Sequence, residues 1–72
     1  MKNQFNEIAL SHFNSLYCYA LSITGGSADA EDLVQETYLR AYRKFDQFEF
    51  GTSCKAWLFR IMRNIAIDQL RK

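Results

Sequence analysis

The amino-acid sequence predicts an all-α protein, organised as a compact three-helix domain with an aromatic loop between the second and third helices. The chain has 72 residues, which is enough for a single domain. It contains no proline and three glycines, so few positions would interrupt a helix. Hydrophobic residues make up 49% of the chain. They recur at steps of three and four, the spacing of helices that bury one face.

The first helix is expected to run from about Phe5 to Ile23. Its apolar side chains form one continuous stripe at helical spacing. This stripe consists of Phe5, Ile8, Ala9, Phe13, Leu16, Tyr17, Ala20 and Leu21. The pair Gly25-Gly26 is expected to end the helix, because glycine readily adopts the left-handed conformation found just past a helix end.

The second helix is expected to be capped by Ser27 or Asp29. Carboxylates crowd its first turns and cations its last turn, which matches the charges that a helix dipole favours at each end. Its apolar stripe consists of Ala30, Leu33, Val34, Thr37, Tyr38, Ala41, Tyr42 and Phe45.

The third helix follows a segment, residues 46–52, that has no helical period and contains a glycine, so a loop is predicted there. Thr52 or Ser53 is expected to cap the helix, which then runs to the end of the chain. Its core stripe consists of Leu58, Ile61, Met62, Ile65 and Ala66.

Charge is separated along the sequence. Residues 1–36 carry one lysine and five acidic residues, a net charge of −4. Residues 37–72 carry eight lysines and arginines and three acidic residues, a net charge of +5. The formal net charge of +1 therefore conceals a dipolar molecule, and its basic part could face nucleic acid.

No catalytic or metal-binding pattern is evident, so a binding module without a cofactor is predicted rather than an enzyme. The single histidine, His12, has no partner at metal or triad spacing and is expected to be a half-buried helix residue. Cys18 and Cys54 match no metal spacing and are expected to be buried or half-buried thiols. Neither a signal peptide nor an apolar run of ~20 residues occurs, which predicts a cytoplasmic protein without membrane insertion.

A second stripe on the second helix points away from its core stripe. It consists of Asp32, Gln35, Glu36, Leu39 and Arg43. A solvated face is the usual explanation of such a pattern. The leucine at its centre instead favours docking against a helix of a partner.

Aromatic and basic side chains are interleaved in the loop and the third helix. Five aromatic residues fall within fifteen positions and are accompanied by Lys55, Arg60 and Arg63. Arg60, Arg63 and Arg71 share one helix face, with Asn64 beside them. Core aromatics and ordinary surface cations are one explanation. However, Phe45, Phe48 and Phe50 are more than a core takes in easily around so short a loop. Single-stranded nucleic acid needs such rings, on which bases stack at ~1–3 kcal/mol each.

Three consecutive segments carry a resemblance to a known family. They are DAEDLVQETYLRAYRKFDQF, FEFGTSCKAWLFRIMRN and IAIDQLRK. Together they resemble region 2 of bacterial RNA polymerase sigma factors, and the extracytoplasmic-function (ECF) group most of all. The resemblance covers essentially the whole chain. The combination is specific, whereas any one segment alone would be weak.

The resemblance implies two binding surfaces. In the family, the DLVQE helix docks on the clamp helices of the polymerase β′ subunit, which implicates the stripe defined above, Asp32, Gln35, Glu36, Leu39 and Arg43. The loop before the Trp helix captures a base flipped from the non-template strand of the promoter −10 element. Here that loop offers Asp46, Gln47 and Phe48, with Phe48 as the expected pocket wall. Flipping costs a few kcal/mol, which the pocket must return.

The third helix is implied to contact the same promoter element and to help open it. Trp57 would stack at the fork or serve packing, and Asn64 would contact upstream bases. Phosphates would be held by Lys55, Arg60, Arg63 and Arg71. This chain has Trp57-Leu58 where the main sigma factors have two tryptophans, which fits the ECF group. Glu49 could repel phosphate.

The resemblance also sets expectations for the rest of the protein. ECF factors add a second helical domain, region 4, which is absent here, so residues 1–72 are expected to be an excised domain that does not support transcription alone. The alternative function is a docking module for an anti-sigma factor, without DNA binding of its own. A generic structural domain is disfavoured by Leu39 and the loop aromatics. Steep salt dependence would indicate phosphate contacts rather than an apolar interface.

Overall fold

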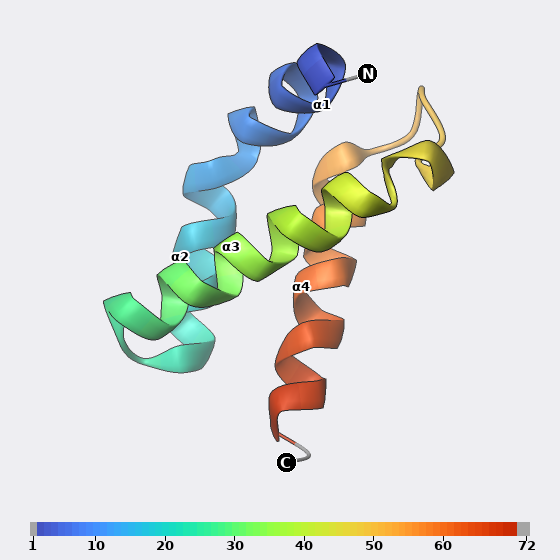
Figure 1. Cartoon of the computed structure of the whole chain (residues 1–72). Coiled ribbons are helices and arrows are strands. Elements are labelled where there is room, and N and C mark those ends of the chain that lie inside the picture. The colour runs from blue at the N-terminus through green and yellow to red at the C-terminus, as the bar shows by residue number, and fades with distance from the viewer. Residues whose placement is uncertain (1, 71–72) are drawn as a thin grey trace.

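The computed structural model describes residues 2–70, without the side chains of residues 2–4 and Ile8 (Figure 1). Its elements are α1 (Lys2–Ala9), the 3₁₀ turn η1 (Leu10–His12), α2 (Phe13–Thr24), α3 (Ser27–Arg43), the 3₁₀ turn η2 (Phe45–Gln47) and α4 (Cys54–Leu70). No strand occurs among residues 2–70. The all-α prediction is therefore confirmed, and each of the three predicted helical segments is present.

Helix α3 occupies the centre of the fold. It packs against α2 on one side and α4 on the other, while α1 extends from α2 toward the start of α4 (Figure 1). Because it has neighbours on two sides, α3 buries a broad face that consists of Ala30, Leu33, Val34, Thr37 and Ala41. The only buried polar side chain in this set, Thr37, donates its hydroxyl to the carbonyl oxygen of Leu33 at 2.7 Å.

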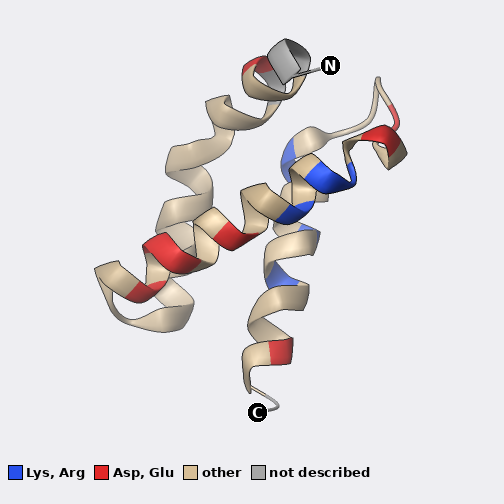
Figure 2. Ribbon diagram, in the orientation of Figure 1, with Lys and Arg blue, Asp and Glu red and all other residues tan. Residues whose placement is uncertain are grey.

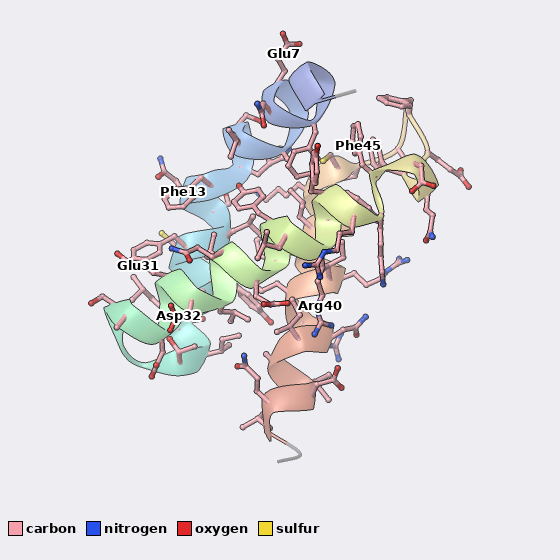
Figure 3. The ribbon with its side chains drawn as sticks, viewed as in Figure 1. Glu7, Phe13, Glu31, Asp32, Arg40 and Phe45 are labelled. Atoms are coloured by element: carbon pink, nitrogen blue, oxygen red, sulfur yellow. The ribbon has the colours of Figure 1, made fainter. Side chains whose placement is uncertain are left out.

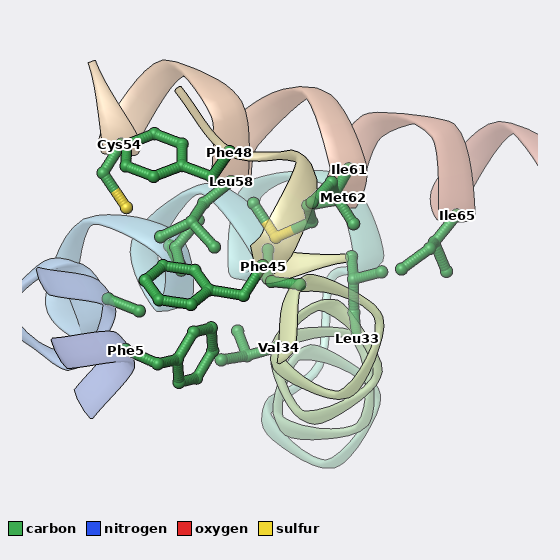
Figure 4. Close-up of a cluster of buried hydrophobic side chains, with 14 of the residues drawn as sticks. Phe5, Leu33, Val34, Phe45, Phe48, Cys54, Leu58, Ile61, Met62 and Ile65 are labelled. Atoms are coloured by element: carbon green, nitrogen blue, oxygen red, sulfur yellow. The ribbon is translucent and has the colours of Figure 1, made fainter. Parts of the chain in front are cut away.

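The core joins all of these helices (Figure 4). On α4 the side chains of Leu58, Ile61, Met62 and Ile65 are buried as predicted, and Ala66 is half-buried. Phe45, which follows α3, is also buried and lies beside Phe5 from α1. This arrangement ties the N-terminal helix to the segment that precedes α4.

The first predicted helix is not continuous, which corrects the sequence analysis. At η1 the backbone N–H of Phe13 bonds to the carbonyl oxygen of Leu10, a three-residue step that replaces the α-helical pattern. The Tyr38 hydroxyl donates a hydrogen bond to the carbonyl oxygen of Ala9 at 3.0 Å, at the point where the pattern changes. With α1 redirected, the ring of Phe5 lies 5.3 Å from that of Phe45.

Two residues of the predicted stripes lie at the surface. Phe13 and Tyr42 are each 44% exposed. Phe13 stacks on Tyr17 along the outside of α2, with ring centroids 6.0 Å apart. The rings of Tyr42 and Phe5 form a T-shaped pair with centroids 5.4 Å apart. The side chain of Ile8, also part of the first stripe, lies outside the described set.

The helix ends follow the sequence in part. Gly25 ends α2 with a φ of 78°, as predicted, and its N–H bonds to Leu21 at 2.9 Å. The prediction that Ser27 or Asp29 caps the next helix is wrong. Gly26 occupies that position in an extended conformation, and its carbonyl oxygen accepts the N–H of Ala30 at 2.9 Å.

At its other end, α3 stops at Arg43, so Phe45, the last residue of the predicted apolar stripe, lies beyond the helix. The predicted cap at Ser53 is confirmed, because its hydroxyl accepts the N–H of Ala56 at 3.1 Å.

The two cysteines differ. Cys54 is buried as expected, and burial raises the pKa of its thiol. Cys18 is exposed, contrary to expectation. The buried face of α2 contains Leu16 and Ala20, and Cys18 lies on the other face of this helix. His12 is half-buried, as expected. Within residues 2–70, no helix combines the length and apolar character that crossing a membrane requires.

We expect the Tyr38→Phe variant to lose about 1 kcal/mol in free energy of unfolding, because the Ala9 carbonyl oxygen loses its hydroxyl donor. Burial, and secondarily the charge of Cys54, raises the pKa of the Tyr38 hydroxyl, so it is a neutral donor at pH 7. Urea unfolding followed by circular dichroism measures the change. Tyr42→Phe, at an exposed position, is the control and should change stability by less than about 0.5 kcal/mol. Equal losses in the two variants would contradict a role for this bond.

Candidate nucleic-acid interface

The loop between α3 and α4 is held by short-range hydrogen bonds. The N–H of Gln47 bonds to Lys44 at 2.8 Å, and that of Phe48 to Phe45 at 3.1 Å, which forms η2. A turn then follows in which the hydroxyl and N–H of Thr52 both donate to the carbonyl oxygen of Glu49. Gly51 lies in this turn with a φ of 94°, a conformation that side chains other than glycine strain to adopt.

This loop and the first turns of α4 form a small pocket that is open to solvent. It is lined by Gln47, Phe48, Glu49, Thr52, Ser53, Ala56, Trp57 and Arg60. The side chains combine aromatic surface, amide and hydroxyl hydrogen-bonding groups, one carboxylate and one guanidinium. Because Glu49 would repel a phosphate, the pocket suits the ring of a base, with phosphate nearer to Arg60. We call it the loop pocket.

The aromatic rings behind the loop pocket correct the expectation that the core would not take in the loop phenylalanines. Phe45 and Phe48 are 4% and 7% exposed, so the core takes in two of the three loop phenylalanines. Only Phe50, at 59% exposed, remains at the surface. Phe48 lies between Phe45, on which it stacks at 6.0 Å, and Trp57 at 5.0 Å. It therefore forms the back of the pocket, and the half-buried Trp57 offers the more accessible ring.

The outward face of α4 is basic. Arg60, Arg63 and Asn64 are all exposed and lie opposite the buried stripe of this helix. The ammonium of Lys55 lies 5.9 Å from the ring centroid of Phe59, within the range of a cation–π interaction. Among the described side chains the ion pair is Glu36–Arg40, which leaves the cations of α4 available to an anionic ligand.

A second, shallow groove adjoins the loop pocket along α4. It is lined by Tyr19, Ala56, Phe59, Arg60, Arg63, Asn64 and Ile67. Ala56 and Arg60 line both hollows. The exposed Arg60 side chain is therefore within reach of a ligand in either hollow.

Charge is separated in space as it is in sequence. Figure 2 shows carboxylates along the first half of α3 and cations at its C-terminal end and on the first half of α4. A third hollow, between the ends of α2 and α4 and the start of α3, includes Asp29 and Asp32 and would repel phosphate. Among the described residues, positive charge is therefore concentrated at the C-terminal end of α3 and on the first half of α4, with Asp46 and Glu49 in the loop between them.

The second predicted surface lies on α3. Asp32, Gln35, Leu39 and Arg43 are exposed, and Glu36 is half-buried. Leu39 is 52% exposed in the middle of this polar face. The carboxylate of Glu36 pairs with Arg40 at 3.2 Å, and Figure 3 labels Arg40 and Asp32 along the same helix. We call these five predicted residues the α3 face.

The predicted nucleic-acid residues are only partly brought together. The loop pocket includes Gln47, Phe48, Trp57 and Arg60, whereas Asp46 lies in a separate hollow with the end of α3. Arg71 lies outside the described residues. Sequence reasoning missed pocket residues Thr52, Ser53 and Ala56 and the groove residue Tyr19. The two hydroxyls were visible only as possible helix caps, and nothing in the spacing brought Tyr19 to α4.

The structure therefore defines a small helical domain with surfaces suited to binding other molecules. It has a basic, aromatic surface on one side and an amphipathic helix face on another. Within residues 2–70 no cluster of three metal-ligating side chains is present. Comparison with known proteins identifies the family to which this domain belongs.

A family model described as Sigma-70 region 2 matches residues 8–72. The ECF RNA polymerase sigma factor EcfG of Rhodopseudomonas palustris is 47% identical over 58 residues, which cover 81% of this chain and 32% of that protein. The ECF RNA polymerase sigma factor SigM of Bacillus subtilis is 40% identical over 67 residues, or 93% of this chain and 40% of that protein. The chain belongs to the Sigma-70 region 2 family and is a region 2 domain of the ECF group.

The chain spans about a third of the length of these curated relatives. The same holds for the ECF RNA polymerase sigma factor SigL of Mycobacterium tuberculosis, which is 44% identical over 61 residues, 83% of this chain and 34% of that protein. The shared part is the helical domain described above. Family membership thus confirms the resemblance.

Proposed function

We propose that this domain recognises the −10 element of a promoter during the initiation of transcription and helps to melt it. The loop pocket would take one base flipped from the non-template strand. Arg60, Arg63 and Lys55 would hold the adjacent phosphates, and Asn64 would contact bases upstream. The observation that carries this proposal is the loop pocket itself, where Trp57 lies beside an exposed guanidinium.

A captured base needs an aromatic surface to stack on and hydrogen-bonding groups at its edge. A flipped base loses its stacking and pairing, which costs a few kcal/mol, and aromatic contact returns ~1–3 kcal/mol. The half-buried Trp57 supplies that contact, while the amide of Gln47 and the hydroxyls of Thr52 and Ser53 offer hydrogen bonds to the base edge. Phe48 supports Trp57 from behind at 5.0 Å.

The α3 face would dock on the clamp helices of the polymerase β′ subunit. It is amphipathic, with Leu39 exposed between polar neighbours, as a helix–helix interface requires. The ion pair of Glu36 and Arg40 would keep the centre of this face ordered. Polymerase and DNA would thereby occupy different elements, α3 on one hand and the loop with α4 on the other.

The separation of the polymerase-binding and DNA-binding surfaces is tested with two variants at exposed positions, Leu39→Ala and Gln47→Ala. We expect Leu39→Ala to weaken binding to core RNA polymerase by more than about 1 kcal/mol, since truncation removes the central apolar contact. Its affinity for single-stranded −10 oligonucleotides should not change. Gln47→Ala should show the reverse pattern.

The two affinities are measured separately, by fluorescence anisotropy with labelled oligonucleotide and by titration of core polymerase. Each variant is the matched control for the other, because both side chains are exposed and neither contributes to the core. If both variants lost both activities to the same degree, the two surfaces would not be separate.

A second candidate function is docking to an anti-sigma factor. The observation that favours it is the number of large apolar side chains on the surface of α2 and η1, where Leu10, Phe13 and Ile23 are 51%, 44% and 45% exposed. A partner that covered them would bind through apolar contact, with little dependence on salt. DNA binding through Arg60 and Arg63 would instead weaken steeply as salt is raised.

A further inference from the structure

The groove beside the loop pocket has an aromatic wall that comes from a different helix. Tyr19 of α2 meets Phe59 of α4 edge to face, with ring centroids 5.2 Å apart and planes at 70°. Tyr19 is 38% exposed, whereas Phe59 is half-buried and has the Lys55 ammonium over its ring. Tyr19 is therefore the more open ring of this pair.

The charge of the groove suits an anionic strand. Arg60 and Arg63 lie along it, and no carboxylate is among the described residues that line it. Helix α2 contains no aspartate, glutamate, lysine or arginine, so the wall formed by Tyr19 adds no repulsion. By contrast, the hollow at the far end of α4 includes Asp29 and Asp32 and is unsuited to DNA.

The groove adjoins the loop pocket. Ala56 and Arg60 line both, so a strand that leaves the pocket past these two residues can enter the groove. The groove extends from Ala56 to Ile67, a length of about 16 Å along the helix axis. That length accommodates more than one further nucleotide.

We propose that Tyr19 is a second base-stacking surface for the same DNA strand. A nucleotide adjacent to the one in the loop pocket enters the groove and stacks on the Tyr19 ring, while Arg60 and Arg63 hold the phosphates on either side. Stacking on a ring is tolerant of sequence, so Tyr19 lengthens the contact without adding base preference. This inference rests on the proposed binding of single-stranded −10 DNA.

The test uses the 72-residue chain and three fluorescent oligonucleotides. The first is a short core sequence selected for binding, and the others carry the same core with a few added nucleotides on the 5′ side or on the 3′ side. We expect one extension to raise the affinity of the unmodified protein. In Tyr19→Ala that extension should bind about tenfold more weakly, a change of about 1.4 kcal/mol, while the core alone binds unchanged. Tyr19→Phe should retain the gain, because it keeps the ring.

Phe13→Ala provides the matched control. Phe13 lies on the same helix (Figure 3) and is 44% exposed. It stacks on Tyr17 and is not among the residues that line the groove. It should bind all three oligonucleotides like the unmodified protein. A loss of the same size in Phe13→Ala would overturn the specific role of Tyr19.

Other outcomes separate this inference from the proposed function. If Tyr19→Ala kept the full gain from extension while Gln47→Ala weakened the core, the second stacking surface would be wrong and the loop pocket would stand. If the unmodified protein bound none of the oligonucleotides, both proposals would be contradicted.

Discussion

Replacing Phe45 with alanine is expected to lower the free energy of unfolding by about 3–5 kcal/mol, the range found for buried phenylalanines. Phe45 is 4% exposed and contacts the rings of Phe5, Phe48, Phe50 and Trp57 at centroid distances of 5.3–6.5 Å. Its removal would leave a cavity where α1, the loop and α4 meet. Urea unfolding monitored by circular dichroism measures the loss.

Two further variants keep this prediction testable if Phe45→Ala does not fold. Phe45→Leu preserves most of the volume and should cost about 1 kcal/mol. Phe50→Ala removes the same type of side chain from a position that is 59% exposed, and it should cost less than about 1 kcal/mol. Similar losses at positions 45 and 50 would show that the aromatic cluster does not carry the stability assigned to it.

Arg60→Ala is expected to cause the largest loss of DNA affinity among exposed positions. Arg60 lines both the loop pocket and the groove beside it along α4, so its guanidinium is placed to contact phosphate in either one. Loss of a hydrogen bond to a charged group costs about 1.5–3 kcal/mol, which corresponds to roughly ten- to a hundredfold in affinity. The slope of log affinity against log salt should also fall by about 0.7, the value for one phosphate on a single strand.

Arg40→Ala is the control for the change in net charge. It removes one positive charge from the chain, but the Arg40 guanidinium already pairs with Glu36 at 3.2 Å. We expect its affinity for the oligonucleotide and its salt slope to match those of the unmodified protein. Equal salt slopes for Arg60→Ala and the unmodified protein would contradict phosphate contact by Arg60.

Most of the fold could be predicted from the sequence because apolar spacing determines which helix face is buried. The stripes of α3 and α4 placed Leu33, Val34, Leu58 and Met62 correctly in the core. The break at η1 could not be predicted in this way, since the apolar stripe continues through it. It is accompanied by a contact with Tyr38, a residue 29 positions from Ala9, which local patterns do not encode.

The candidate site was predicted less completely, because tertiary contacts decide which of its residues come together. The sequence indicated that loop aromatics and cations belong together, but not which rings would be buried. Phe48 lies in the core because Phe45 and Trp57 flank it, a result of how α4 turns back on the loop. Tyr19 meets α4 only because α2 and α4 both pack on α3. Such contacts follow from the assembled fold.

The central claim is that the loop pocket and the basic face of α4 read single-stranded −10 DNA. The most direct test measures binding of the 72-residue chain to short single-stranded oligonucleotides with randomised −10-like sequence, at two salt concentrations. Gln47→Ala is the pocket variant of choice, because Gln47 is exposed whereas Phe48 is part of the core. We expect sequence-selective binding that weakens with salt and loses its selectivity in Gln47→Ala. Binding without sequence selectivity, or selectivity unchanged in Gln47→Ala, would contradict it.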